Sequence, residues 1–218
     1  GIGMFQANQA FVQLVAATGG ASSFAAGHGA TVGSILALSV AAVILGGIRA
    51  IARVTSALVP LMAALYIGTG LVVIASHLDR VPEALVRIVT EAFTTQGASG
   101  GVLGVVVLGF RRAAFSNEAG IGSSSIAHSV VRTKEPLTQG FVAMLEPFID
   151  TIIVCSITAL VITTSVDASA LGTGAVSGVE LTSDAFAQVV SWFPPVLSVV
   201  VFLFAYSTLI SWSYYGRE

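Results

Sequence analysis

Long apolar segments recur along this chain, and most charged residues fall between them. Hydrophobic residues make up 55% of the 218 residues, whereas only 9% are charged. A soluble domain carries roughly 25% charged residues. A membrane-spanning helix needs about 20 mostly apolar residues, and in hydrocarbon its backbone polar groups must be paired within the helix itself. The chain is therefore expected to be an all-α polytopic membrane protein.

Six segments are apolar enough to form all or part of a membrane span. They are expected at about 3–19, 31–48, 54–76, 102–131, 137–163 and 194–215. A charged amphipathic helix is expected at the interface at about 82–94. A short external helix is expected at about 182–192, with Thr182 or Ser183 as its N-cap. We interpret residues 1–218 as a single transmembrane domain and as an internal piece of a longer protein, because both ends fall in or directly after apolar segments.

Basic residues near the ends of these segments predict the orientation in the membrane. If the first span runs outward, most of them share one side: Arg49, Arg53, Arg132, Lys134 and Arg217. The other side has Arg80 and Arg87. The positive-inside rule makes the first side cytoplasmic. The amphipathic helix and the segment before residue 182 are then expected to be external.

Several other classes of protein do not fit the sequence. The net charge of -2, without clustered Lys and Arg, argues against nucleic-acid binding. The three histidines, His28, His77 and His128, have no ligand-like spacing, so they are not expected to bind a metal. No nucleophile–base set or phosphate loop is present, so we expect neither an enzyme nor an organic cofactor. The single cysteine, Cys155, is expected to be a small buried residue.

A short polar run at residues 115–125, FSNEAGIGSSS, interrupts the fourth expected span. An acid and an amide at mid-membrane depth persist only where they are packed in protein or line a cavity. Gly120 and Gly122 allow the backbone to leave the helical path, and a broken span is typical of a transporter binding site. The alternative is a helix kink packed on small residues, with Glu118 in a structural ion pair. The residues alone leave both interpretations open.

A second candidate surface lies near the end of the last span. Thr208 and Trp212 are four residues apart and share a helical face, to which Ser211 and Tyr215 add hydroxyl groups. Such a face suits a small, partly apolar ligand or a hard cation. The alternative is that the hydroxyls bond back to their own helix while the aromatic rings form an interfacial belt. Taken by itself, this face favours the alternative.

Polar side chains also occur inside two other spans. Gln6, Gln9 and Gln13 follow helical spacing and form one polar stripe, which lines a pocket or water path or else bonds to a neighbouring helix. Glu146 and Asp150 flank Pro147 in the fifth span. Their carboxylates either bind a proton or an ion, or they pair with a group on a neighbouring helix.

Five segments, in order along the chain, resemble the alanine or glycine:cation symporters, a family typified by bacterial sodium:alanine symporters. These segments are 4–9, 44–48, 115–123, 148–155 and 205–216, and together they extend over nearly the whole chain. The resemblance implies a partial LeuT-type inverted-repeat core, from about the third to the eighth core helix. The interrupted span would then be the sixth core helix.

The resemblance also implies which residues bind solutes. The substrate-binding positions would be Gln6, Phe115, Asn117, Gly120, Thr208 and Trp212. A coupling cation would lie between the first and eighth core helices, and the eighth would contribute Ala205, Ser207 and Thr208.

The function that the resemblance implies is sodium-coupled symport of a small neutral amino acid, alanine or glycine, by alternating access in a bacterial inner membrane. The expected partners are the amino acid, the sodium ion and the lipid bilayer. A proton-coupled transporter of the same fold is the alternative, and a channel or a non-transporting scaffold is less favoured. Without the first core helix, the 218 residues by themselves are expected to be inactive.

Overall fold

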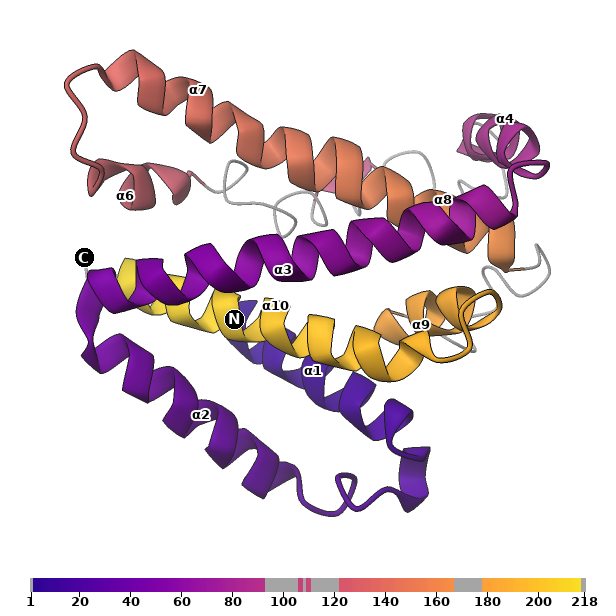
Figure 1. The fold of residues 1–218 in the computed structure, drawn as a ribbon, viewed down its shortest axis with the longest axis horizontal. Coiled ribbons are helices and arrows are strands. Elements are labelled where there is room, and N and C mark those ends of the chain that lie inside the picture. The colour runs from indigo at the N-terminus through magenta and orange to yellow at the C-terminus, as the bar shows by residue number, and fades with distance from the viewer. Residues whose placement is uncertain (1, 93–105, 108, 111–121, 167–177, 217–218) are drawn as a thin grey trace.

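The computed structural model describes residues 2–92, 106–107, 109–110, 122–166 and 178–216 (Figure 1). Within these ranges the regular elements are helices, without any strand. Three helical stretches are long and apolar enough to cross a membrane: Gly47–Ser76, Pro136–Ser165 and Phe193–Tyr215. The expected all-α architecture is therefore confirmed for the described residues.

The first part of the chain forms α1 (Ile2–Ala17), the short 3-10 turn η1 (Gly20–Ser22), α2 (Gly29–Leu45) and α3 (Gly47–Ser76). Between α2 and α3 the chain reverses at a glycine pair, where Gly47 has a φ of 69°. Glycine adopts this left-handed conformation without strain. Helix α3 therefore begins at Gly47 rather than near residue 54. Arg49 and Arg53 lie in its first turns rather than between two helices.

The remaining described helices are α4 (Val81–Ala92), α6 (Ser124–Ser129), α7 (Pro136–Pro147), α8 (Cys155–Ser165), α9 (Val179–Ala187) and α10 (Phe193–Tyr215). The wider π-helical turn η3 (Phe148–Val154) joins α7 to α8 in one long rod. It follows Pro147, which lacks the N–H of a helical hydrogen bond and therefore interrupts the regular α-helix. Cys155 is exposed at the start of α8, so the prediction that it is buried is wrong.

Helix α9 begins earlier than the sequence suggested. It starts at Val179, so Thr182 and Ser183 lie inside the helix and the prediction that one of them is the N-cap is wrong. The N-cap is Gly178, with a φ of 66°. A Cβ at that position would lie 3.0 Å from Gln9 Oε1. The left-handed backbone conformation therefore favours glycine there, and a larger residue would also displace the Gln9 side chain.

The connections between helices gather at two opposite ends of the molecule (Figure 1). One end holds α4, α9 and the connection from α1 to α2. The other end holds the start of α3, the connection from α6 to α7 and the end of α10. Arg49 and Arg53 lie at the start of α3, and Arg132 precedes α7. Most of the basic residues used for the orientation therefore lie at the end expected to be cytoplasmic.

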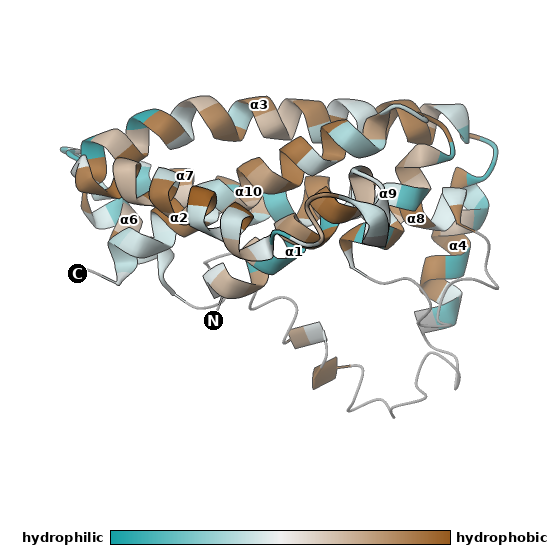
Figure 2. Cartoon of the chain, turned by 90° about the horizontal axis from the view of Figure 1, so that it is seen from below, coloured by the Kyte–Doolittle hydropathy of each residue, from teal (hydrophilic) through white to brown (hydrophobic). Residues whose placement is uncertain are grey.

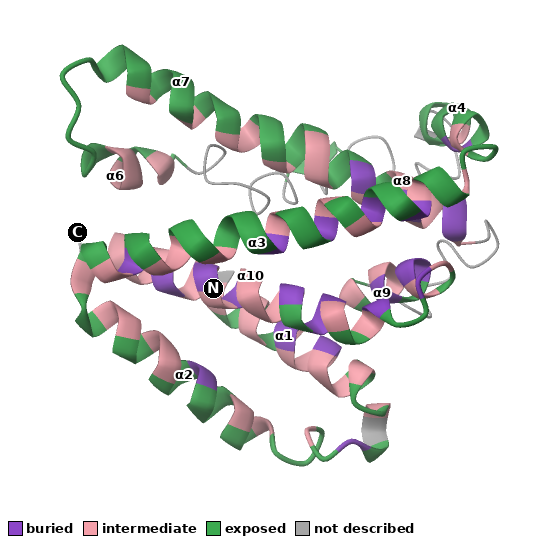
Figure 3. Ribbon diagram, viewed as in Figure 1, coloured by how far each residue is buried: buried purple, intermediate pink, exposed green. Residues whose placement is uncertain are grey.

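The main core lies where α3, α8, α9 and α10 meet. Phe186 of α9 is fully buried there, with its ring centroid 4.8 Å from that of Phe193 and 5.5 Å from that of Tyr66. The Tyr66 and Thr158 hydroxyls form a hydrogen bond of 2.7 Å between α3 and α8. Burial concentrates in these central helices and in α1, whereas α2 and α7, at opposite edges of the view, are largely exposed (Figure 3).

The exposed surface of the long helices is rich in hydrophobic residues (Figure 2). Leu38 of α2 is 71% exposed, and Met144 of α7 is 67% exposed. A soluble monomer rarely leaves large contiguous apolar patches uncovered. Surface of this kind is suited to contact with lipid or with further transmembrane helices.

Helices α3 and α8 approach each other closely at Gly70. A Cβ at this position would lie only 2.3 Å from Ile157 Cγ2. Helices in lipid gain little from the hydrophobic effect, so close packing at small residues supplies much of their association. Gly68, two residues earlier on α3, has nothing within 4 Å of the equivalent position. Only Gly70 is therefore needed for the contact.

We expect Gly70→Ala to lower the free energy of unfolding of the full-length protein by about 1–3 kcal/mol, because the β-branched Ile157 cannot easily turn its Cγ2 away. Thermal unfolding in detergent measures this loss. Gly68→Ala is the matched control and should be neutral or slightly stabilising, since alanine is the better helix former. Ile157→Ala should recover part of the loss in the Gly70→Ala background. Equal stability of the two glycine variants would contradict the contact.

Candidate functional site

The described candidate residues lie on one pair of neighbouring helices, α1 and α10. A Cβ on Gly3 would lie 2.8 Å from Leu209 Cδ2. Ser198 Oγ lies 3.2 Å from Gln13 O and 3.1 Å from Pro194 O of its own helix, and its single hydrogen is shared between these two acceptors. These two contacts show that α1 and α10 run antiparallel. Gln6 lies about one helical turn from Gly3, and Ala205 lies about one turn from Leu209 in the same direction. The glutamine and the expected cation-binding residues therefore lie at the same depth on adjoining helices.

The hydroxyl groups of Ser207 and Thr208 are bonded to their own helix, α10. Thr208 Oγ1 donates a hydrogen bond of 2.9 Å to Phe204 O, and Ser207 Oγ donates one of 3.0 Å to the same carbonyl. This is the arrangement that the sequence offered as the alternative to a ligand site. Because a hydroxyl carries a single hydrogen, both oxygens keep only acceptor lone pairs. In this arrangement they can contact a cation or an N–H donor, but they cannot donate to an anion.

Two further candidates lie on the same helix. Ala205 is fully buried and has no polar side-chain atom, so its backbone carbonyl is its only acceptor. Trp212 is half-buried one turn beyond Thr208, and its ring meets that of Tyr215 edge-on with the centroids 5.6 Å apart. The end of α10 thus presents an aromatic wall beside two acceptor oxygens.

The glutamine stripe of α1 divides into residues with different partners. Gln13 is fully buried, and its Nε2 donates a hydrogen bond of 3.1 Å to Ser183 Oγ of α9. Its Oε1 is buried without a partner among the described residues. Gln9 Oε1 lies close to Gly178 at the start of α9. Gln13 therefore fits the helix–helix interpretation. Gln6 is half-buried, and its side chain makes no hydrogen bond within the described part of the chain.

The other proposed wall of the site lies outside the described residues. This applies to Phe115, Asn117 and Gly120, so the structure does not place them against α1 and α10. The polar run is described only from Gly122, which has a φ of 83°. Regular helix begins at Ser124, so the backbone is not helical at this end of the run.

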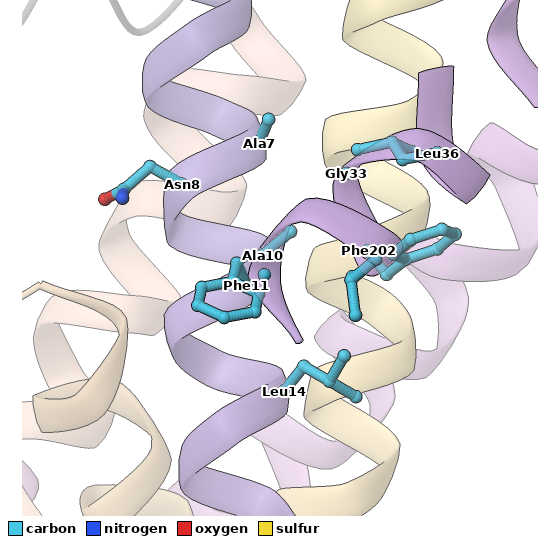
Figure 4. Close-up of a pocket in the computed structure, with 10 residues that line it drawn as sticks. Ala7, Asn8, Ala10, Phe11, Leu14, Gly33, Leu36 and Phe202 are labelled. Carbon is cyan, nitrogen blue, oxygen red and sulfur yellow. The ribbon is translucent and has the colours of Figure 1, made fainter. Parts of the chain in front are cut away.

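A cavity of about 210 Å³ opens between α1, α2 and α10. Figure 4 shows that α1 lines it with residues including Ala7 and Phe11, and that Leu36 and Phe202 line it from the other helices. None of the candidate substrate or cation residues is among those that line it. The sequence reasoning did not identify this cavity, because its walls are ordinary apolar and small residues of three different helices.

Sequence comparison relates the whole chain to one group of transporters. The sequence model of the sodium:alanine symporter family matches residues 1–218. The sodium/alanine symporter AgcS of Methanococcus maripaludis is 38% identical over 187 residues, which are 85% of this chain and 41% of that protein. The probable sodium/glutamine symporter GlnT of Bacillus subtilis is 37% identical, over 86% of this chain and 39% of GlnT. The amino-acid carrier protein AlsT of the same organism is 35% identical, over 84% of this chain and 39% of AlsT. The chain spans about two fifths of the length of these curated relatives.

We expect Ser183→Ala to lower the free energy of unfolding of the full-length protein by about 1–3 kcal/mol, because it leaves the buried Gln13 amide group without its acceptor. Gln13→Met combined with Ser183→Ala should cost much less, since both polar partners are then replaced by apolar groups of similar size. Unfolding of the wild type, both single variants and the double variant completes a double-mutant cycle. A double variant that costs the sum of the two single changes would contradict a direct contact.

Proposed function

The chain belongs to the sodium:alanine symporter family, as its motifs predicted, and from this premise we propose that the full-length protein couples sodium entry to the uptake of alanine, glycine or a similar small neutral amino acid. The family and the named relatives are transporters rather than enzymes. The proposal includes a multi-pass location in a bacterial inner membrane, with sodium as the coupling ion and no organic cofactor. The match over residues 1–218 is the observation that carries it.

In this proposal the amino acid binds between α1, α10 and the interrupted span. Gln6 has both a donor and an acceptor and can serve either the carboxylate or the ammonium group of the substrate. Thr208 Oγ1, whose hydrogen is directed to Phe204 O, accepts from the ammonium group. Trp212 limits the size of the side chain, and Phe115, Asn117 and Gly120 complete the pocket.

The coupling ion binds beside the substrate on α10. Sodium is a hard cation and prefers oxygen ligands, as calcium and magnesium do. Ser207 Oγ and Thr208 Oγ1 offer lone pairs because their hydrogens are engaged with Phe204 O. The carbonyl of Ala205 adds a third oxygen. This part of the proposal is supported by the acceptor-only character of the two hydroxyls.

Transport proceeds by alternating access in a LeuT-type inverted-repeat core, of which this chain forms about the third to the eighth helices. Sodium and amino acid favour one packing of the broken helices against the others, and they shift the equilibrium only by their difference in affinity for the two states. The described residues supply one side of the site. Because the chain spans about two fifths of the length of its relatives, we do not expect the 218 residues alone to transport.

We expect Gln6→Ala and Thr208→Ala each to reduce sodium-dependent alanine uptake about tenfold or more, because each removes a hydrogen bond to a charged group of the substrate. Uptake is measured with the full-length protein in proteoliposomes under a sodium gradient. Thr208→Ser keeps the hydroxyl and should retain most of the uptake. Asn8→Ala, an exposed amide off the glutamine stripe of α1, should leave it unchanged.

The same assay separates the proposal from its rivals. Uptake driven by a pH gradient without sodium would replace sodium by a proton as the coupling ion. A preference for glutamine over alanine at equal concentration would overturn the substrate class. Parental uptake by normally expressed Gln6→Ala and Thr208→Ala proteins would remove both residues from the site.

We expect Ser207→Ala to raise the sodium concentration needed for half-maximal uptake about tenfold, because one oxygen ligand is lost. The KM for alanine at saturating sodium should change little. Ser213→Ala is the matched control, since Ser213 Oγ also donates to a carbonyl three residues earlier on α10, that of Ile210, at 2.5 Å. An equal sodium dependence of the two variants would exclude Ser207 as a cation ligand.

A further inference from the structure

Helix α4 lies across the end of the spanning helices. It is seen end-on in Figure 1, beside the ends of α3 and α8, and it runs crosswise to α3 in Figure 2. Ala84 is only 3% exposed where α4 packs against α8. Leu85, Val86 and Val89 are at least half exposed. An amphipathic helix in this position, with apolar residues on its open side, is suited to the boundary between hydrocarbon and headgroups.

A polar cavity of about 240 Å³ separates part of α4 from the end of α8. It is lined from α4 and the preceding turn by Arg80, Glu83, Ala84 and Arg87, and from α8 by residues including Thr164. Arg80, Ala84 and Arg87 follow the spacing of one helical face. Along this face, Arg80 therefore precedes and Arg87 follows Ala84, the residue at which α4 packs against α8.

Most N–H donors of both arginines have no partner among the described residues. Arg80 Nη1 donates to Thr164 O at 3.3 Å, and no carboxylate lies within salt-bridge distance of Arg80 among the described residues. Arg87 Nε pairs with Glu91 Oε1 at 2.7 Å, and Glu91 is exposed. Glu83 lines the same cavity but forms no ion pair with either arginine within the described structure. A guanidinium carries further N–H groups in a planar fork, and this fork matches the oxygens of a phosphate.

We propose that this cavity binds the phosphate group of a membrane lipid, with Arg80 and Arg87 as its contacts. The spanning helix α3 ends at Ser76, a few residues before Arg80, so the cavity lies near the end of a membrane span. The exposed apolar residues of α4 enter the same boundary. A phosphodiester headgroup at this depth presents oxygen acceptors for the remaining N–H groups of the two guanidinium forks, while its acyl chains remain in the hydrocarbon.

The test compares lipids with the same acyl chains and different headgroups. Dioleoylphosphatidylglycerol and dioleoylglycerol, which lacks the phosphate, are titrated into the full-length protein in detergent and followed by native mass spectrometry. We expect the phospholipid to bind and the diacylglycerol to bind far more weakly. Arg80→Gln with Arg87→Gln should weaken phospholipid binding about 25-fold, because each basic residue near a lipid surface contributes about fivefold.

Three single variants test the contribution of individual charges to phospholipid binding. Arg87→Gln alone should weaken binding about fivefold, and it leaves the Arg80 contact with Thr164 intact in case the double variant folds poorly. Glu83→Gln should strengthen binding, because it removes a negative charge from the cavity wall. Lys134→Gln, in the connection at the opposite end of the molecule, is the control and should change nothing at this site.

Phospholipid binding that is equal in the wild type and the arginine variants would overturn the proposal, as would equal binding of the diacylglycerol. Displacement of the phospholipid by millimolar inorganic phosphate would assign the cavity to the free anion and also overturn the lipid. The readout does not involve amino-acid uptake. Its outcome is therefore separate from that of the proposed transport function.

Discussion

Helix α10 packs against α1, α2, α3 and α9, and the arrangement of the described helices depends on these contacts. Helices in lipid gain little from hydrophobic association, so small residues and buried hydrogen bonds must hold them. Along the pair α1–α10, the contact of Gly3 with Leu209 and the bond from Ser198 to Gln13 do this at two levels. The candidate site inherits its geometry from the same pair, because the candidate positions that the structure describes lie on these two helices.

Helix α9 ties this pair to the other long helices. Ser183 bonds to Gln13 of α1, and Phe186, about one turn later, packs on Tyr66 of α3 and Phe193 of α10. A short helix of nine residues thereby joins the polar stripe of α1 to the apolar core. The helices that contact α9 are consequently better packed than α2 and α7, whose apolar surfaces remain open to lipid or to further protein.

Much of the fold followed from the length and spacing of apolar residues, and the errors have local physical causes. Helix α3 extends back to Gly47 because a glycine turn suffices to reverse the chain, and the long side chains of Arg49 and Arg53 are compatible with the end of a spanning helix. Helix α9 starts at Val179 because Gly178 supplies a left-handed residue. Cys155 is exposed because an apolar run in a membrane protein is also suited to face lipid, so hydrophobicity there does not imply burial.

The sequence by itself determined that the chain is helical and membrane-spanning, which helical faces are polar, and which family it belongs to, because these properties depend on composition, short spacing and ordered motifs. Only the tertiary structure decided what each polar group contacts. Gln6 and Gln13 are equivalent in their spacing, yet Gln13 bonds to a serine 170 residues away while Gln6 has no such bond among the described residues. The hydrogen bond from Arg80 to the carbonyl of Thr164, 84 residues away, likewise could not be predicted from the local sequence. Such partners are set by the packing of distant helices, which no local periodicity encodes.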